Sequence, residues 1–550
     1  MSRTGVVVLL TTAMLALPPT GTASDIPPVV EQVRVELGKK SSDAGGCPLP
    51  VVSHWASGFG GTNFSSDYQT SLLEGGHHVM PTLPFPMPGE AGYVATGAAL
   101  VRKLAEWRAP ISLRDGQPES LLYAENFPKD AHGKWLNLPL DASPLCIGPD
   151  GKLEKRLSPF GAIQPWYEVG AYHTISGSFK QLEQWYPDPP FVVLLSNNEP
   201  NRLMPKYGIE SDQRYVKKYG TGKSAEFQRG AVGEGYVERY AALLKGLRDG
   251  LSAGAWREHA LLVGYDAFGP PHFGRWHGWT EYSLSTAQEI SPWPRVWDGA
   301  SVSYYTNNWD GSTDYRVWSP QVEAMNWVFM LEETRRVNPD FWFELSPWDG
   351  NWGTNKVYAK EKSKLSSYLQ AGQTWSPERY AGFVQFGMWL LKPRVVREFR
   401  GSSVLLSDFQ REFEALVGGV DRVWENPTLT RFWRQGRLVP NPTREHPYQT
   451  DIPVKWKSVS RWFLLNTSLD PKGEWGLNTE VPVFSIANVM GEAGGREWLL
   501  YAHAPLGPHT GVKIEIPGYG NVTVDVTPGG VFYLVKEQDR SVTRVTDGGS

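Results

Sequence analysis

The sequence predicts an α/β fold, a (β/α)8 barrel followed by a small C-terminal β-sandwich. Between residues 51 and 425, short apolar runs alternate with stretches of helical spacing. Strands that are apolar on both faces are typical of a parallel sheet covered by helices. Eight such strand–helix units can be counted, which favours a closed TIM barrel over an open doubly wound sheet. From about residue 454 the helical period disappears, and short strands alternate with Gly and Pro turns, as in a sandwich.

The predicted barrel strands are short runs rich in Val, Ile, Leu and aromatic residues. We expect them at residues 51–55, 78–83, 111–114, 191–195, 260–264, 300–305, 341–343 and 386–390. Between them, apolar side chains recur at the spacing of one helix face, as at Leu100, Leu104 and Trp107. We expect helices at residues 69–73, 98–107, 166–185, 234–247, 320–337, 377–386 and 409–423.

The C-terminal strands are expected at residues 461–465, 481–486, 498–503, 512–516, 522–526 and 531–535. The whole chain then divides into a signal segment (1–24), a lead segment (25–50), the barrel (51–425), a linker (426–453), the β-sandwich (454–540) and a polar tail (541–550). No glycine-rich phosphate-binding motif opens the first helix, which disfavours a nucleotide-binding sheet.

The composition excludes some classes of protein. Of 550 residues, 41% are hydrophobic and 20% charged, which is ordinary for a globular chain and excludes wholesale disorder. A net charge of −4 gives no basic excess for binding nucleic acid. The aromatic content is unusual, with 24 Trp, 23 Tyr and 22 Phe. Such rings suit a core, and they also suit stacking against the face of a sugar.

Residues 1–24 have the features of a secretory signal. Arg3 is followed by an apolar run at 5–17 and by small residues at 22–24. The run is too short to span a bilayer, which needs ~20 residues. We therefore expect a secreted or periplasmic protein without a membrane span. The alternatives are a buried first strand or a membrane anchor.

The chain has two cysteines, Cys47 and Cys146. In an exported protein they could form one disulfide, or they could be two buried thiols. Neither has the spacing of a zinc ligand, and we expect no metal and no cofactor.

The strongest local signal for chemistry follows the fourth predicted strand. The apolar run 191–195 leads into Asn197, Asn198, Glu199 and Pro200. Polar groups at the carboxyl ends of barrel strands are candidates for catalysis, because the active sites of such barrels lie at that face. The alternative is a plain turn, since Asn and Pro both favour turns.

The same arrangement recurs three units later. The predicted strand 341–343 is followed by Glu344 and then by an aromatic-rich loop that contains Trp348. An unpaired carboxylate is costly among Phe and Trp neighbours unless function requires it. The alternative is a salt-bridged glutamate on a loop.

Two carboxyl groups across a barrel mouth are what cleavage of a glycosidic bond needs: a protonated one for the leaving oxygen and an ionised one for the anomeric carbon. Asn-Glu-Pro after strand four and a glutamate after strand seven resemble the retaining glycoside hydrolases of clan A. These include β-galactosidases, β-glucanases, β-mannanases, xylanases and agarases. The resemblance implies that Glu199 is the acid/base, that Asn198 binds the sugar 2-hydroxyl and that Glu344 is the nucleophile.

Other candidates lie at predicted strand ends. Arg114 is expected either to hold a catalytic carboxylate ionised or to be a surface arginine. The resemblance implies a tyrosine beside the nucleophile, either Tyr304 or Tyr305, of which only one can point into the barrel. Trp389 is expected to floor the sugar site after strand eight, with core packing as the alternative.

Four further residues are weaker candidates. Asp266, after the fifth strand, is the main rival carboxylate. His54 ends the first strand, where a packed core residue is the commoner outcome. Trp309 and Trp348 belong to ring-rich loops, in which we expect both sugar-stacking and packing residues.

Three functional hypotheses remain. The first is a secreted retaining glycosidase acting on a polysaccharide or oligosaccharide. Among polymers we prefer a β-galactan such as agarose or porphyran, with a β-glucan or β-mannan as alternatives. The second is a non-catalytic carbohydrate-binding protein on a barrel scaffold. The third, a metal-dependent or serine hydrolase, is disfavoured because no HxH, HExxH or GxSxG motif stands at a strand end.

Overall fold

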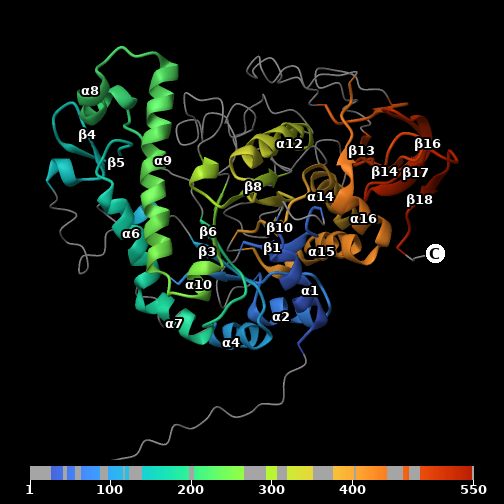
Figure 1. The fold of residues 1–550 in the computed structure, drawn as a ribbon, viewed down its shortest axis with the longest axis horizontal. Coiled ribbons are helices and arrows are strands. Elements are labelled where there is room, and N and C mark those ends of the chain that lie inside the picture. The colour runs from blue at the N-terminus through green and yellow to red at the C-terminus, as the bar shows by residue number, and fades with distance from the viewer. Residues whose placement is uncertain are drawn as a thin grey trace, which may run out of the picture.

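The structure is a computed structural model. It describes residues 26–40, 46–55, 63–86, 97–115, 118–122, 139–196, 203–265, 293–305, 319–350, 376–401, 404–442, 462–469 and 483–547. Figure 1 shows strands surrounded by helices, with antiparallel sheets on one side and a helical projection on the other. The predicted signal segment 1–24 lies outside the described residues. Among the described helices, none is long and apolar enough to cross a membrane.

In the described part of the chain, eight parallel strands form one sheet. They are β1 (Val51–His54), β2 (Thr82–Pro84), β3 (Ile111–Asp115), β6 (Val192–Ser196), β7 (Ala260–Tyr265), β8 (Gly299–Tyr305), β9 (Trp342–Trp348) and β10 (Val395–Glu398). Each pairs with its neighbours in chain order, and β10 pairs with β1. An isolated bridge between Val52 and Val79 closes the ring.

The register of the strands identifies the type of barrel. Following the paired residues once around the ring displaces the register by eight residues. Eight strands with a shear of eight are the geometry of a TIM barrel, whose interior is filled by layers of side chains. The predicted fold class, a TIM barrel followed by a β-sandwich, is confirmed.

Helices cover the outside of the barrel. They are α1 (Pro28–Leu37), α2 (Ser66–Glu74), α4 (Ala98–Trp107), α6 (Gln164–Ile175), α7 (Gly177–Trp185), α9 (Ala225–Gly250), α10 (Ala255–Glu258), α12 (Ser319–Val337), α14 (Pro377–Leu391), α15 (Gln410–Glu425) and α16 (Pro427–Gln435). Short 3-10 turns lie at η1 (Pro118–Leu122), η3 (Leu140–Ala142), η4 (Ile209–Ser211), η6 (Trp293–Arg295) and η9 (Leu406–Asp408). Serine caps fix several starts: Ser65 accepts a hydrogen bond from the Tyr68 amide, and Ser376 from the Arg379 amide.

Helix α9 has 26 residues and packs against α6 through glycines. A Cβ at Gly170 would lie 2.0 Å from the Leu243 carbonyl oxygen, and one at Gly246 would lie 2.1 Å from the Tyr167 oxygen. No larger residue fits at either position without a shift of the helices. The far end of α9 carries the hairpin β4 (Leu145–Ile147) and β5 (Leu153–Leu157) together with α8 (Gln213–Tyr219), which make up the projection in Figure 1.

In the described residues of the C-terminal region, two antiparallel sheets are present. One comprises β11 (Arg437–Leu438), β13 (Phe484–Met490), β14 (Glu497–His503), β17 (Val531–Lys536) and β18 (Val542–Arg544); the other comprises β12 (Asn466–Thr467), β15 (His509–Ile516) and β16 (Gly520–Val526). The first sheet packs directly on α14, where Tyr501 Oη donates to the Gly382 carbonyl oxygen at 2.8 Å. A Cβ at Gly382 would lie 2.1 Å from the Pro528 oxygen.

The prediction of the eighth barrel strand at 386–390 is wrong. Those residues belong to α14, and the strand is β10, four residues beyond the helix. An apolar run buried on nearly all sides has no period that separates helix from strand. The helix ends where Lys392 adopts a left-handed conformation, with φ 45°.

Smaller differences concern the C-terminal segments and the cysteines. The segment predicted as a linker contains α16 and β11, and the predicted tail contains β18. The strand expected at 461–465 is displaced, because residues 462–465 are irregular and β12 follows them. The other domain bounds stay a prediction. Cys47 and the buried Cys146 are both free thiols.

Candidate functional site

Neighbouring side chains of β8 point to opposite faces of the sheet, as the pleat of a strand requires. Tyr304 lies on the outer face, where its ring stacks on Phe383 of α14 at 4.0 Å and its hydroxyl donates to the Phe383 carbonyl oxygen at 3.3 Å. Tyr305 contacts Tyr265 of β7, with 3.5 Å between the two hydroxyl oxygens, and Trp348 of β9 at 5.2 Å between rings. Of the two candidate tyrosines, Tyr305 is therefore the one inside the barrel.

Inside the barrel, Glu344 of β9 forms a two-point salt bridge with Arg397 of β10. Arg397 Nε lies 2.5 Å from Glu344 Oε2, and Nη2 lies 2.8 Å from Oε1. Trp342 Nε1 donates to the same Oε1 at 2.9 Å. Both charged side chains are fully buried.

The rest of the Arg397 guanidinium bonds to the first two strands. Its Nη1 donates to Ser53 Oγ at 3.0 Å, to the His54 carbonyl oxygen at 3.2 Å and to Thr82 Oγ1 at 3.1 Å. Ser53 and Thr82 are themselves 2.7 Å apart through their hydroxyls. The charge pair is therefore the centre of a polar network that links β9, β10, β1 and β2, as a buried charge requires.

The position of Glu344 differs from the prediction, which placed it after the end of strand seven. Strand β9 continues to Trp348, so Glu344 is the third of its seven residues. Ser346 and Trp348 follow on the same face of the strand, nearer its carboxyl end. Ser346 Oγ accepts a hydrogen bond from Trp55 Nε1 at 3.0 Å. The strand extends because the run after Glu344 pairs residue by residue with β8 as far as Tyr305.

Among the described residues, five rings meet at the carboxyl ends of the strands, and we call them the mouth cluster: the buried Trp55, Tyr265, Tyr305 and Trp348 and the partly buried Phe399. Trp55 contacts Tyr265 at 5.5 Å and Phe399 at 6.2 Å, and Phe399 contacts Tyr305 at 5.3 Å. Tyr265, Tyr305 and Trp348 are the last residues of β7, β8 and β9, and Trp55 and Phe399 directly follow β1 and β10. The predicted candidates Tyr305 and Trp348 are members of this cluster.

Arg114 lies at the same end of the barrel. Its guanidinium carbon is 5.6 Å from the centre of the Trp55 ring, a cation–π distance, and its side chain is partly exposed. The structure therefore brings Arg114 to the mouth cluster.

Two other predicted residues lie away from the mouth cluster. His54 is stacked on Phe64 at 3.8 Å, and burial lowers the pKa of its imidazole to about 3. Trp389 was expected after strand eight, and this placement is wrong because the residue belongs to α14. Its ring packs against Trp433 and Phe532, and its Nε1 donates to Gln385 at 3.1 Å. Core packing accounts for all of these contacts.

The remaining predicted residues, Glu199, Asn198, Asp266 and Trp309, lie outside the described residues. Strand β6, which precedes Asn198 and Glu199, ends at Ser196, paired with Asp115 of β3 and Gly264 of β7. Within the described ranges, no group of three or more His, Cys, Asp or Glu residues is arranged to hold a metal ion.

A second buried charge network, which the sequence pattern did not predict, lies near the ends of β9 and β10. Arg400 bonds to Asp349, with Nη2 3.0 Å from Oδ2, and also pairs with Glu398. Tyr380 of α14 donates to Glu398. The pKa of Glu398 is raised to about 8: burial is the largest cause, Arg400 opposes it and nearby Asp349 adds to it. Arg397, Glu398 and Arg400 directly follow the apolar pair at 395–396, so a correct placement of strand eight would have identified them.

No protein-family model and no curated protein matches the chain. Among solved structures, the chain is similar to a native Bacteroidetes-affiliated GH5 cellulase linked with a polysaccharide utilization locus: 12% identity, 74% of this chain and 97% of that chain covered, TM-score 0.32. It is also similar to the GH53 catalytic domain of Ignisphaera aggregans: 10% identity, 65% and 85% covered, TM-score 0.32. An arabinofuranosidase structure matches at 14% identity, with 82% and 90% covered and a TM-score of 0.22. Likeness at such TM-scores supports no inference about activity.

Proposed function

We propose that the protein is a secreted glycoside hydrolase that cleaves β-glycosidic bonds of a polysaccharide or oligosaccharide with retention of configuration. The observation that carries the proposal is the mouth cluster: five rings and Arg114 gathered at the carboxyl ends of the barrel strands, the face at which such barrels bind their substrates. Flat rings beside polar groups are suited to the apolar face and the hydroxyls of a sugar.

In the proposed mechanism, Glu199 protonates the glycosidic oxygen while Glu344 attacks the anomeric carbon and forms a glycosyl ester. Water then opens the ester, and Glu199 accepts its proton. Asn198 binds the 2-hydroxyl of the sugar. The hydrogen bonds from Arg397 and Trp342 fix both oxygens of Glu344 and so orient the attacking atom.

The depth of Glu344 sets a condition on this mechanism. Ser346 and Trp55 form their hydrogen bond nearer the strand ends than Glu344. A sugar must therefore pass the level of this bond to reach Glu344 from the mouth. If it does not, the nucleophile is another carboxylate, for which Asp349, next to the end of β9, and Asp266 are the candidates.

The nucleophile can be identified by trapping. A 2-deoxy-2-fluoro glycoside slows the opening of the glycosyl ester, because an electron-withdrawing group destabilises the oxocarbenium-like transition state. The labelled enzyme is digested and the modified peptide mapped by mass spectrometry. We expect the label on Glu344 and none in the Glu344→Gln variant. A label on Asp349 or Asp266 would reject the assignment of the nucleophile but keep the retaining mechanism.

The activity itself is tested by incubating the unmodified protein with a panel of polysaccharides. We expect release of reducing ends first from a β-galactan of the agarose or porphyran type, with a β-glucan and a β-mannan as the next candidates. The Glu199→Gln variant should lose activity on natural substrates and keep sugar binding. Sugar binding without hydrolysis by the unmodified protein would instead indicate a carbohydrate-binding protein on a barrel scaffold.

A further inference from the structure

The projection at the far end of α9 has an unusual charge. Residues 203–229 contain six Lys or Arg and three Asp or Glu, in a chain whose net charge is −4. One of the acids, Asp212, is fully buried and caps α8. Within the described residues, no carboxylate pairs with Lys206, Lys217, Lys218 or Lys223. The surface of this segment is therefore positive.

Aromatic rings accompany these lysines at the surface. Tyr207 is 75% exposed and Phe227 is 40% exposed, unusual values for large rings. Lys206 Nζ lies 5.3 Å from the centre of the Tyr207 ring, and Lys223 Nζ lies 5.9 Å from that of Phe227. Lys218 lies 5.1 Å from the Tyr219 ring.

The rings and lysines form one surface. Tyr219 contacts Phe227 at 5.4 Å, so the last residue of α8 touches the start of α9. Glu210 accepts hydrogen bonds from the Gly222 amide at 2.7 Å and from Gln228 Nε2 at 3.1 Å, which holds the segment after Tyr207 against the same loop. We call this surface the lysine–aromatic patch: Lys206, Tyr207, Lys218, Tyr219, Lys223 and Phe227.

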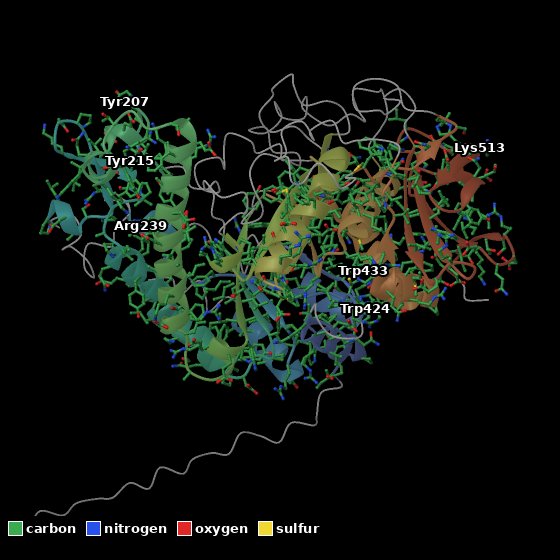
Figure 2. All side chains as sticks on the ribbon, turned by 45° about the horizontal axis from the view of Figure 1, so that its top comes forward. Tyr207, Tyr215, Arg239, Trp424, Trp433 and Lys513 are labelled. Carbon is green, nitrogen blue, oxygen red and sulfur yellow. The ribbon has the colours of Figure 1, made fainter. Side chains whose placement is uncertain are left out.

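The patch lies on the same side of the barrel as the mouth. Arg248, near the end of α9, donates to the carbonyl of Ala260, the first residue of β7, at 3.0 Å. The start of α9 therefore points toward the carboxyl ends of the strands. A helix of 26 residues is about 39 Å long, whereas a strand of six residues such as β7 is about 20 Å. The projection thus rises beyond the strand ends, and Figure 2 shows Tyr207 at its outer end.

We propose that the lysine–aromatic patch is a binding site for a polysaccharide that carries sulfate or carboxylate groups. The rings provide stacking surfaces for sugar faces, and the lysines lie beside them to pair with anionic substituents. This proposal rests on the proposed function in one respect, because it assigns an anionic glycan to a protein that cleaves glycans. It adds a second glycan-binding surface to the one proposed at the mouth cluster.

The test measures binding of the full chain to dextran sulfate, polygalacturonate and unmodified dextran by biolayer interferometry. The charge variant is K218A/K223A and the ring variant is Y207A/F227A. The control K152A/K513A removes the same charge at two exposed lysines outside the patch: Lys152, which pairs with Asp150 on the β4–β5 hairpin of the same projection, and Lys513 on β15, which Figure 2 labels. All substitutions are at surface positions, and circular dichroism verifies the fold.

We expect the protein to bind at least one of the two anionic polymers and not dextran. Which polymer binds identifies sulfate or carboxylate as the recognised group. Binding should weaken about 30-fold in K218A/K223A, because each lost cation costs about tenfold or less. It should weaken about tenfold in Y207A/F227A. Added salt should weaken it further. The control should stay within about twofold of the unmodified protein.

Four results would overturn the proposal: no binding to either anionic polymer, equal loss in the control, full binding by the ring variant, or equally tight binding of polyglutamate. The last would indicate an acidic protein as the partner. Hydrolysis of a neutral glycan together with any of these results would reject the patch and keep the proposed function. Binding by the patch without hydrolysis of any glycan would keep the patch and reject the enzyme.

Discussion

Arg397 on β10 holds Glu344 on β9 through both carboxylate oxygens, and the same guanidinium reaches Ser53 and Thr82 across the place where the barrel closes. Between β1 and β2 the backbone contributes one isolated bridge, Val52 to Val79. The side-chain network therefore supplements the backbone pairing where the barrel is weakest. Removing this network should therefore lower the stability of the fold as well as any catalytic activity.

Removing either charge of this pair should destabilise the fold strongly. We expect Arg397→Met and Glu344→Gln each to lower the free energy of unfolding by about 3–5 kcal/mol, because each leaves an uncompensated buried group. The double variant E344L/R397M should recover part of the loss, since it removes both charges. Urea unfolding measures all three. A loss below about 1 kcal/mol in the single variants would show that water reaches the pair.

The two neighbouring tyrosines of β8 should behave differently. Tyr304→Phe removes a hydroxyl that bonds outward to the Phe383 carbonyl oxygen, so we expect a stability loss of about 1 kcal/mol and unchanged kcat/KM. Tyr305→Phe removes a hydroxyl inside the mouth cluster and should lower kcat/KM. Steady-state kinetics on the best substrate compares them. Equal effects of the two substitutions on kcat/KM would contradict the assignment of Tyr305 to the site.

Stability should fall as the pH rises from about 4.5 to about 8, through Glu398. Burial raises the pKa of this carboxyl to about 8 in the folded protein, so the folded state holds a proton that the unfolded chain releases. The free energy of unfolding should drop by up to about 1.4 kcal/mol per pH unit in this range. Glu398→Gln cannot release a proton and should flatten the dependence. Urea unfolding of both proteins at pH 5, 6 and 7 checks it, and parallel curves would refute the role of Glu398.

A single methyl group at Gly382 should loosen the contact between the barrel and the C-terminal sheet. A Cβ there would lie 2.1 Å from the Pro528 oxygen, so we expect Gly382→Ala to cost about 1–3 kcal/mol. Gly418 of α15 is the matched control, because a Cβ there meets nothing within 4 Å. Gly418→Ala should stabilise by up to about 1 kcal/mol through helix propensity. Differential scanning calorimetry compares the two, and a gain for Gly382→Ala would mean that the sheet yields easily.

The barrel was predictable because its strands are apolar on both faces and its helices are amphipathic, so periodicity separates them. The segment 98–107 shows this most clearly: its helical spacing gives α4 with the same bounds. Periodicity does not separate helix from strand where a helix is buried on nearly all sides, as α14 is between the barrel and the C-terminal sheet, because its outer face is as apolar as its inner one. Tertiary contacts such as that of Tyr501 with Gly382 determine the secondary structure of such a segment, and the local sequence pattern does not reveal them.

The types of residue in the site could be predicted from the sequence better than their depth in the barrel. Alternation along β8 required one of Tyr304 and Tyr305 to be inside, and Trp348 was identified at the mouth. The depth of Glu344 depends on how far β9 pairs with β8. Pro347 suggested that the strand ends early, whereas the pairing continues to Trp348. Arg397 escaped notice because its strand was placed nine residues too early.

The length of α9 also sets a scale for any molecule that touches both proposed binding surfaces. The helix rises about 20 Å beyond the ends of the strands, so the lysine–aromatic patch stands well apart from the mouth cluster. A disaccharide can occupy one surface only, whereas a glycan chain of several sugar units can occupy both at once. Two weak contacts on one long molecule reinforce each other because the second becomes intramolecular. The protein would then discriminate among glycans by their length as well as by the sugar at the cleavage point.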